Sequence, residues 1–383
     1  MRLIHTADWH LGRRLKGLDR TPEIAFALNE LITQIKTLDI DAVLVAGDIF
    51  DMPNPPAEAE KVAYHFFCQL HELQIPAVVI TGNHDSPARF EGIANLLSHV
   101  GVQTLARPQL SKQGGIISVN TKNGKLCVAA VPFASERRLL KIEDFMGDLE
   151  QRQHYKGIII QLLNELTQAF QADAVNIILA HLTVEGAIRA YSEIDYYTRD
   201  TYELSRQIFP SEAQYVALGH IHKPQALSGA VPTFYAGSLI QVDFGEAEEK
   251  KGFNLVTVTP NRPATVEFKP IPCQKPLLKV ETDSTLENLA LYREHHGFLK
   301  VIVKLESPQI GLANKVRKIC PQALIVETQY ATIAEETTTQ PTQQFDAIET
   351  FQRYWLERVK TSLPPNVLET FTALYEELRD ASD

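Results

Sequence analysis

Five short apolar segments of this chain each end in side chains that can bind a metal ion. The segments are four to six residues long and rich in valine, isoleucine, leucine and alanine, which predicts β-strands. The strands and the side chains after them are Arg2–Thr6 with Asp8 and His10, Ala42–Ala46 with Asp48, Ala77–Thr81 with Asn83 and His84, Val175–Ala180 with His181, and Tyr215–Leu218 with His220 and His222. Because loops that leave the same end of a sheet converge in space, we expect these side chains to form one site.

The spacing within the motifs places side chains on a shared face. In an extended backbone, residues two apart point to the same side, so His220 and His222 can reach one metal cluster, as can Asp8 and His10. A glycine precedes several of the candidates and lets the backbone turn sharply and approach a ligand closely. These glycines are Gly47, Gly82 and Gly219. The local spacing therefore favours one compact centre.

The candidate ligands are four imidazoles, two carboxylates and one amide oxygen: Asp8, His10, Asp48, Asn83, His181, His220 and His222. Such a nitrogen and oxygen set suits Mn²⁺, Fe²⁺ or Zn²⁺ better than Mg²⁺ or Ca²⁺, which prefer all-oxygen shells. Seven groups are too many for one ion, but with Asp48 shared they divide evenly between two. One ion would take Asp8, His10, Asp48 and His222, and the other Asp48, Asn83, His181 and His220. Two ions ~3.5–4 Å apart can acidify a bridging water and promote in-line phosphoryl displacement, so the sequence predicts a two-metal phosphoesterase.

Three further side chains lie beside the candidate ligands. His84 has no metal role left, and next to Asn83 it is placed to stabilise the transition state or to protonate the leaving alcohol, a contribution of ~10²–10⁴ in rate. Asp51 either supports the ligands from behind or is a turn residue, and the sequence does not distinguish these roles. Asp85 is expected to be a structural turn residue next to the ligands rather than a proton relay.

Each motif alone is a weak signal, because Gly-Asp after a strand is usually only a turn. The complete set, in order and always at a strand end, favours a metal centre. Trp9 and the remaining histidines are expected to be packing or surface residues. A basic group near the N-terminus is interpreted as contacting DNA phosphates, with a solvated surface as the alternative. This group is Arg13, Arg14, Lys16 and Arg20.

Charge and cysteine content bound the classes of function. The net charge of −10 disfavours nucleic-acid binding, but residues 335–383 contain ten acidic and four basic residues, a balance of −6 that carries over half of the excess. Two divalent metal ions would add positive charge at the site, so the net charge does not decide whether the chain binds nucleic acid. The four cysteines form no Cys-x-x-Cys pair, which indicates a reducing compartment. With no apolar run of ~18 residues and no signal-peptide pattern, we expect a cytoplasmic protein.

The composition and hydrophobic pattern of the sequence change along the chain, and these changes predict its domains. Residues 1–272 alternate short apolar runs with amphipathic stretches, which predicts an α/β catalytic domain. Residues 273–333 are predicted to form a small α+β capping domain, and 334–344 have the composition of a linker. Residues 345–383 are expected to form two helices with apolar faces that include Phe351, Trp355 and Phe371.

Further elements are predicted outside the motif strands. The expected helices are one with Thr21 as N-cap and Pro22 at its first position, Ala59–Leu73, Lys156–Phe170, Leu286–His295 and Leu312–Ile319. The expected strands are Lys125–Val131, Thr233–Ala236, Phe253–Thr257, Leu277–Glu281, Phe298–Leu305 and Ala323–Thr328. The stretch Tyr191–Arg206 is expected to be a long loop with some helix.

The motif order D-x-H, G-D, G-N-H-D, H and G-H-x-H resembles the calcineurin-like metallophosphoesterase superfamily. Longer segments are similar to the SbcD family of nuclease subunits, and the similarity covers the whole catalytic region, with a cap and helical tail following in the same order. These segments are Ile4–Gly12, Val45–Asp51, Ala180–Gly186 and Ala217–His222. The resemblance implies a sandwich of two β-sheets flanked by helices, Mn²⁺ in both metal sites, and His84 as a catalytic histidine that binds no metal.

The resemblance also implies an activity and partners. It implies ATP-independent 3′→5′ exonuclease action on double-stranded DNA and single-strand or hairpin endonuclease action, in DNA end processing, repair and recombination. A homodimer would assemble with SbcC, an ATPase with long coiled coils, and the C-terminal helices would bind the base of the coiled coil. The alternative for these helices is packing onto the main body.

Two other functions fit the same residues. The metal site could act on a small phosphodiester or a phosphoprotein, although such an enzyme has little use for a cap and a helical tail. The chain could instead be a scaffold that binds DNA ends without cutting, although the complete ligand set and His84 argue against this.

Overall fold

The computed structural model describes residues 1–134, 154–190 and 203–330, and from the C-terminal region residues 350–352, 354–355, 363–364, 367–368 and 370–372. The chain divides into two compact units, Met1–Tyr330 and Ala331–Asp383. The predicted linker 334–344 and most of the loop predicted at Tyr191–Arg206 lie outside the described residues. None of the described helices is long and apolar enough to cross a membrane.

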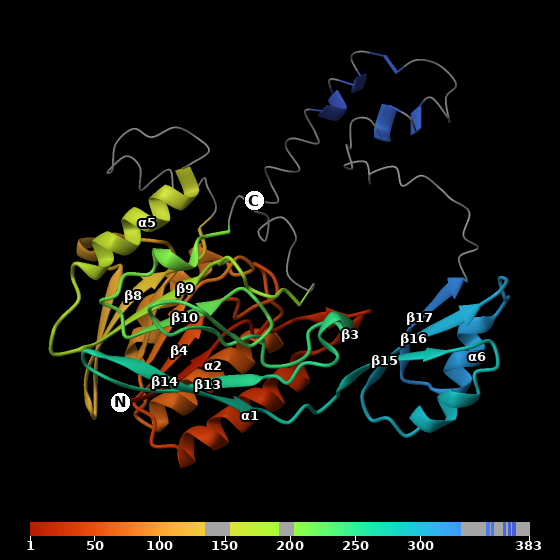
Figure 1. Ribbon diagram of the computed structural model, residues 1–383, viewed down its shortest axis with the longest axis horizontal. Helices are drawn as coiled ribbons and strands as arrows, with labels where there is room; N and C mark the ends of the chain where they lie inside the picture. The colour runs from red at the N-terminus through yellow and green to blue at the C-terminus, as the bar shows by residue number, and fades with distance from the viewer. Residues whose placement is uncertain are drawn as a thin grey trace. The chain divides into compact units, whose positions relative to one another are not determined.

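Two six-stranded sheets form the larger part of the first unit (Figure 1). The first sheet has the order β14-β13-β1-β4-β5-β6. Strands β1, β4, β5 and β6 are parallel to one another, β13 pairs antiparallel with β1, and β14 pairs antiparallel with β13. Its strands are β1 (Arg2–Thr6), β4 (Ala42–Ala46), β5 (Ala77–Ile80), β6 (Val102–Leu105), β13 (Gly252–Thr259) and β14 (Arg262–Pro270). The first three lie where the sequence predicts them, while β6 and β14 were not predicted.

The second sheet has the order β11-β12-β10-β9-β8-β7, with an antiparallel strand at each edge and four parallel strands between them. Its strands are β7 (Ile116–Thr121), β8 (Gly124–Val131), β9 (Val175–His181), β10 (Tyr215–Gly219), β11 (Gln225–Leu227) and β12 (Thr233–Tyr235). The central strands match the predicted ones within one residue at each end, since hydrophobic runs this continuous are typical of strands buried on both faces. The edge strands β7 and β11 were not predicted.

The two sheets pack face to face. Along β1, Leu3 points to the core between the sheets and Ile4 to the core beneath the helices, as the two-residue period of a strand requires. The inter-sheet core continues through Leu44 on β4 and Leu126 on β8. These contacts confirm the sandwich that the family resemblance implied.

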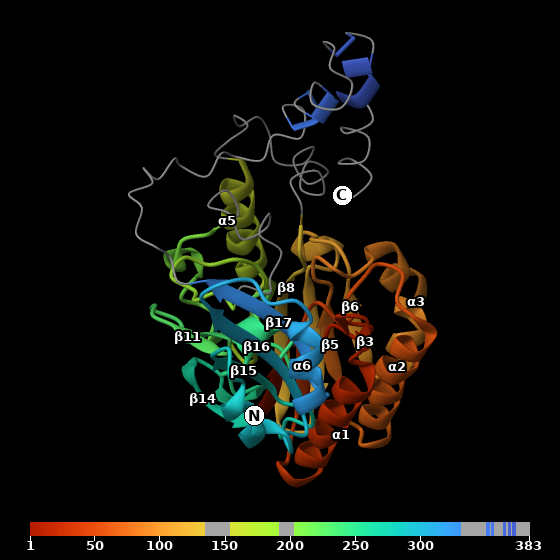
Figure 2. The ribbon, with the colours of Figure 1, turned by 90° about the vertical axis from the view of Figure 1, so that its right-hand side faces the viewer.

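Helices cover both outer faces of the sandwich (Figure 2). The first sheet is covered by α1 (Thr21–Thr37), α2 (Ala57–Glu72) and α3 (Pro87–His99), and the second by α5 (His154–Thr167). Helix α1 begins one residue earlier than predicted, with Arg20 as N-cap, because the side chain of Asp19 accepts the Thr21 N–H at 2.9 Å. Helix α3 was not predicted, although Ser86 before Pro87 is a recognisable helix start, and its hydroxyl accepts the Arg89 N–H.

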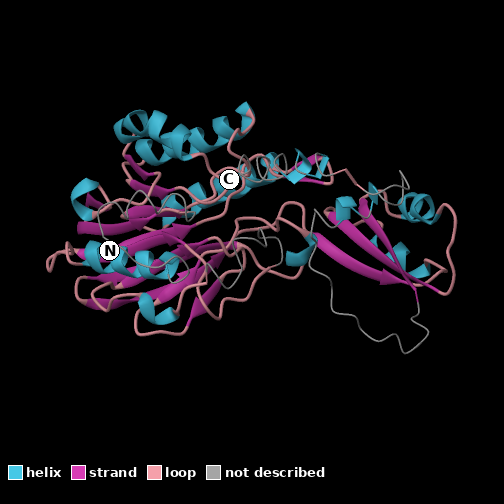
Figure 3. Ribbon diagram, turned by 90° about the horizontal axis from the view of Figure 1, so that it is seen from above, coloured by secondary structure: helices cyan, strands magenta, loops and turns pink. Residues whose placement is uncertain are grey.

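A separate three-stranded parallel sheet lies in the region predicted to form the cap (Figure 3). Its strand order is β15-β16-β17. Its elements are β15 (Leu277–Thr282), β16 (Phe298–Leu305), β17 (Ala323–Tyr330) and α6 (Leu312–Ile319), close to the predicted bounds. The helix predicted over Leu286–His295 is instead a 3-10 helix, Glu287–Tyr292. The spacing of its apolar residues explains the difference. Leu286, Leu289 and Tyr292 are three residues apart and all pack into the core of this region, as the three-residue turn of a 3-10 helix allows.

The predicted cap contacts the larger part of the first unit through a small apolar cluster. Leu15 from the hairpin of β2 (Arg14–Leu15) and β3 (Leu18–Asp19) is buried with Phe244 and Leu277. Beside it, Arg20 is fully buried, pairs with Glu23 through two bonds of 2.6 and 2.8 Å, and lies 5.6 Å from the centre of the Phe298 ring. The predicted phosphate contact of Arg20 is therefore wrong, since a guanidinium enclosed by protein cannot reach DNA.

Candidate metal centre

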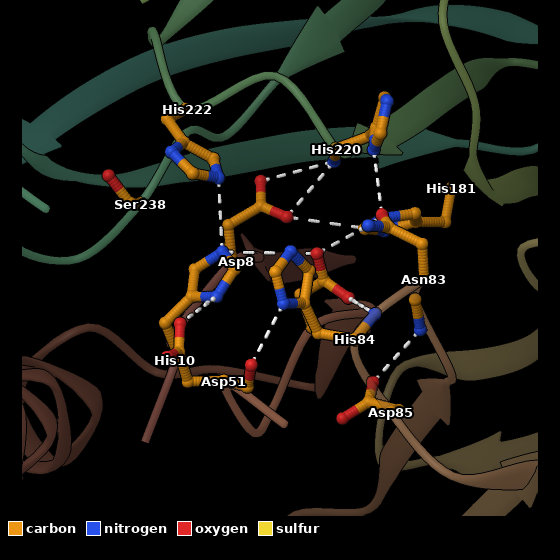
Figure 4. A network of polar contacts seen from close by, with 12 residues as sticks. Asp8, His10, Asp51, Asn83, His84, Asp85, His181, His220, His222 and Ser238 are labelled. Carbon is orange, nitrogen blue, oxygen red and sulfur yellow. Dashed lines mark hydrogen bonds and ion pairs between the residues drawn. The ribbon is translucent and has the colours of Figure 1, made fainter. Parts of the chain in front are cut away.

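The motif loops come from both sheets and meet at one edge of the sandwich. The loops after β1 and β4 run side by side, with the Asp8 N–H donating to Gly47 O and the His10 N–H to Asp48 O, both at 3.0 Å. The second sheet joins them through two bonds: the His220 N–H donates to Asp8 Oδ1 at 3.0 Å, and His181 Nδ1 donates to Ala46 O at 2.7 Å. The seven predicted ligands thus lie together, and Figure 4 labels all of them except Asp48.

One half of the cluster is built around His10 and His222. Their Nε2 atoms lie 3.0 Å apart, and Asp8 completes a group whose ligand atoms lie within 4.8 Å of one another. Asp48 Oδ2 lies 3.8 Å from His10 Nε2. This half corresponds to the first predicted ion.

The other half is built around Asn83. Its Oδ1 lies 3.0 Å from His181 Nε2 and 2.9 Å from His220 Nδ1. Asp48 Oδ2 lies 3.4 Å from His181 Nε2 and so faces both halves. This half corresponds to the second predicted ion, with Asp48 between the two.

The spacing and chemistry of these atoms fit divalent cations. Ligands at ~2.0–2.2 Å from an ion stand ~3–4 Å from one another, as these nitrogen and oxygen atoms do. All are imidazole nitrogens, carboxylate oxygens or an amide oxygen, which are ligands for first-row transition metals. The predicted ligands are buried except Asn83, which is half-buried, so the cluster is shielded from bulk water.

Burial and mutual charge set the ionisation of the cluster in the protein alone. Burial raises the pKa of Asp8 to about 6, against the opposing effect of His181 and His222. Burial also opposes ionisation of Asp48, but the facing rings of His181 and His84 hold its pKa well below the ordinary value. Although burial lowers it, the pKa of His181 is raised to about 9 because Asp48 faces it. In the protein alone, an ionised Asp48 therefore faces a protonated His181.

His84 lies next to the cluster and is anchored at both its backbone and its ring. Its N–H donates to Asp48 Oδ1 at 2.9 Å, and its Nδ1 lies 2.9 Å from Asp51 O. Its ring meets that of His10 edge to face, with centroids 4.7 Å apart. If Nδ1 donates to the carbonyl, Nε2 is left to exchange a proton with a substrate.

Asp51 and Asp85 both contact the site from behind. Asp51 Oδ1 lies 3.2 Å from His10 Nδ1 and 3.2 Å from Arg13 Nη1. Asp85 is buried and accepts three backbone N–H bonds, from Gly82 at 2.9 Å, Phe50 at 3.0 Å and Ile49 at 3.2 Å. Asp85 thus ties the loop after β5 to the loop after β4.

The remaining predicted phosphate contacts and Trp9 can also be placed. Arg14 and Lys16 are exposed on the β2–β3 hairpin, where Arg14 donates to Gly17 O at 2.8 Å, and the Arg13 side chain is one quarter exposed beside Asp51. Trp9 is fully buried against Phe66, with ring centroids 5.1 Å apart, which confirms its packing role.

Sequence reasoning missed three side chains around the cluster. Phe133, just past β8, stacks on His220 and meets His181 edge to face, with centroids 6.2 Å apart in each case. Glu246 and Lys251 lie behind His222 in a segment whose alternating charges resemble a solvated surface. Only the tertiary contacts distinguish them from their exposed neighbours.

The fold and the cluster define a metal-dependent phosphoesterase class, and a family model confirms it. The model for calcineurin-like phosphoesterases matches residues 1–224, which hold all seven candidate ligands. The chain therefore belongs to the calcineurin-like phosphoesterase family, whose members bind divalent metal ions.

Within this family, the chain is similar to the D subunits of SbcCD nucleases. The one from Bacillus subtilis is 33% identical over 330 residues, 84% of each chain. The one from Escherichia coli K12 is 30% identical over 292 residues, 74% of this chain and 71% of the relative. The one from Staphylococcus saprophyticus is 28% identical over 341 residues, 86% and 85% of the two chains.

Proposed function

We propose that this chain is the nuclease subunit of an SbcCD-type complex and hydrolyses DNA phosphodiesters with two divalent ions. The observation that carries the proposal is the buried cluster in which Asp48 faces two sets of nitrogen and oxygen ligands. The relatives that cover most of the chain are named as nuclease subunits, which favours DNA as the substrate.

The division of the ligands follows the two halves of the cluster. One ion would be held by Asp8, His10, Asp48 and His222, and the other by Asp48, Asn83, His181 and His220. We assign Mn²⁺ to both sites because imidazole and carboxylate ligands together suit it better than Mg²⁺. When bound, such a pair would neutralise charge on the phosphate and acidify a water for in-line attack.

The protein groups position the substrate and move the proton. His84, fixed by Asp51 O at 2.9 Å, is placed to stabilise the pentavalent phosphate or to protonate the leaving 3′ or 5′ oxygen. Arg14 and Lys16 on the exposed hairpin, with Arg13 beside Asp51, are placed to contact the DNA backbone. Asp51 supports His10 from behind, and Asp85 fixes the loop that carries Asn83 and His84.

The activity within this proposal is 3′→5′ exonuclease action on duplex DNA and endonuclease action on single strands and hairpins, in end processing, repair and recombination. Residues 1–272 would form the nuclease domain and 273–333 the cap. The chain would act as a homodimer in the cytoplasm. The free thiols of all four cysteines fit a reducing compartment.

The C-terminal region is proposed to bind the SbcC-type ATPase. In the second unit, Phe351 stacks on Phe371 with centroids 4.0 Å apart and rings 6° from parallel, and Trp355 meets Phe351 edge to face at 6.2 Å. The two predicted helical faces therefore meet each other at one point. Tyr354 beside them is 56% exposed, so apolar surface is left for a partner.

A nuclease assay of the purified chain tests the proposal. We expect linear duplex DNA labelled at one end to be shortened in Mn²⁺ and left intact in EDTA, with greater activity when the SbcC-type ATPase and ATP are added. A chromogenic phosphodiester run in parallel distinguishes the competing function. Cleavage of that compound without any cleavage of DNA would show an enzyme for small phosphodiesters, and DNA binding without cleavage of either would show a scaffold.

A further inference from the structure

A buried charged pair lies behind the metal cluster, on the side of His222. Glu246 is fully buried and Lys251 is 4% exposed, and Lys251 Nζ lies 2.7 Å from Glu246 Oε2. Buried ion pairs contribute little net stability, because the loss of hydration offsets the attraction between the charges. A role beyond stability is therefore the better explanation for this pair.

The first oxygen of Glu246 faces His222. Oε1 lies 3.1 Å from His222 Nδ1, while the other ring nitrogen, Nε2, lies 3.0 Å from His10 Nε2 in the cluster. An imidazole that donates its Nδ1 proton to a carboxylate presents a bare lone pair at Nε2. A metal ligand needs that tautomer. Figure 4 shows the His222 ring turned toward His10.

The second oxygen of Glu246 is fixed in turn. Oε2 accepts the Val242 N–H at 3.0 Å and lies 3.3 Å from Ser238 Oγ, in addition to the contact with Lys251. Lys251 Nζ also donates to the main-chain oxygen of His222 at 2.8 Å. Both the ring and the backbone of His222 are therefore attached to the same charged pair.

His222 differs in this respect from its counterpart in the other half. His181 is oriented by a backbone carbonyl, Ala46 O, at 2.7 Å from its Nδ1. A carbonyl orients a ring, whereas a carboxylate also makes the ring nitrogen a stronger donor to a metal.

We propose that Glu246, held in place by Lys251, is a positioning residue that fixes the tautomer and direction of His222 and strengthens metal binding on the His10 side of the cluster. The proposal rests on the ligand assignment of the proposed function. It predicts an effect on one ion and not on the other, because His222 belongs to the group around His10. The other group consists of Asn83 with the imidazoles of His181 and His220.

Titration of Mn²⁺ into the metal-free full chain tests the proposal, with calorimetry to give the affinities and electron paramagnetic resonance to count free Mn²⁺. We expect Glu246→Gln to weaken one of two bound ions by about 10–100-fold and to leave the other within about twofold of the parent. Glu249→Gln is the matched control, because Glu249 also lies 2.8 Å from Lys251 Nζ but on the partly exposed side of the pair. It should bind both ions as the parent does.

The double variant Glu246→Gln, Lys251→Met removes both charges and leaves no lone ammonium buried. We expect the same selective loss of one ion, with circular dichroism in EDTA like that of the parent. Two ions bound with parental affinity by both variants would overturn the positioning role, as would equal weakening of both ions. A parent chain that binds fewer than two Mn²⁺ would instead overturn the ligand assignment itself, so the two failures are distinguishable.

Discussion

At the scale of single residues, the side chains around the cluster differ in the contacts that fix their positions. The candidate ligands contact one another, whereas His84 is half-buried and its ring is fixed by the main chain at Asp51 O. In the proposed assignment its ring belongs to neither metal set, although it lies within reach of His10 and Asp48. This separation allows chemistry and metal binding to be tested independently.

We predict that His84→Gln lowers the single-turnover rate of DNA cleavage by about 10²–10⁴, because a general acid or a donor to the transition state is lost. Mn²⁺ affinity measured by calorimetry should stay within about twofold of the parent value. Loss of a contact that supports a metal ligand would weaken binding by more, about 10–100-fold. His99→Gln, at the exposed end of α3, is the control and should cleave at the parental rate. A variant of His84 that cleaves normally would exclude it from the mechanism.

His5 gives a second prediction, on the pH dependence of stability. It is fully buried between the sheets, with Tyr215 Oη 2.8 Å from Nδ1 and Leu218 O 3.1 Å from Nε2, and burial lowers its pKa from 6.5 to about 3. Between pH 3 and pH 6.5, His5 is protonated in the unfolded chain but not in the folded chain. Stability is therefore retained above pH 6.5 and lost as the pH falls toward 3, by up to about 1.4 kcal/mol per pH unit.

Urea unfolding of the metal-free chain at several pH values between 7 and 4.5 measures this effect. His5→Gln lacks the titrating ring, so its free energy of unfolding should fall less steeply with decreasing pH than that of the parent. Other buried histidines titrate in both proteins and cancel in the difference. Parallel curves for parent and variant would show that His5 does not carry the effect.

At the scale of elements, the close approach of β4 and β10 sets the distance between the two sheets at the site. A Cβ added to Gly219, at the end of β10, would lie 1.9 Å from Ala46 O, at the end of β4. A backbone oxygen cannot move aside as a flexible side chain does. The absence of a side chain at Gly219 therefore brings His181 and His220 against the loops of the first sheet.

Gly219→Ala is accordingly predicted to push the sheets apart at the site, with a loss of about 1–3 kcal/mol in the free energy of unfolding and weaker Mn²⁺ binding. Gly92→Ala is the matched control, since nothing lies within 4 Å of the added Cβ and the exposed helical position should gain about 0.5–1 kcal/mol. Denaturant unfolding and calorimetry measure both effects. Unchanged metal binding in Gly219→Ala would contradict this account of the spacing.

At the scale of the whole molecule, the chain consists of two compact units that divide after Tyr330. Among the described residues, the cores of the first unit, including the one around Val301, consist of residues before this point. Chemistry and partner binding are thus placed in different parts of the chain in the proposed function.

A chain ending at Tyr330 is predicted to fold and to bind two Mn²⁺ like the full chain, because it keeps every core residue and candidate ligand of the first unit. It should fail to associate with the SbcC-type ATPase in size-exclusion chromatography, whereas the full chain associates. Association of the shortened chain would place the partner surface in the first unit instead.

Sequence alone indicated the candidate ligands and determined the five strands that carry them. Asp48, His181 and the His220-Ile221-His222 segment could be predicted because each follows a continuous apolar run, and both the run and the ligand chemistry are local properties of the chain. The edge strands β7 and β11 were missed because they are only partly buried, and their hydrophobic signal is correspondingly weak.

Only the tertiary structure decided which segments face one another. Arg20 resembles its exposed basic neighbours in sequence, but its contacts with Glu23 and Phe298 bury it at the cap. Glu246 lies in a charged stretch, but the fold turns it toward His222. Burial and charge pairing depend on residues that are far apart in the chain. A local sequence pattern shows how polar a residue is, but it does not show which residues that side chain contacts in the folded protein.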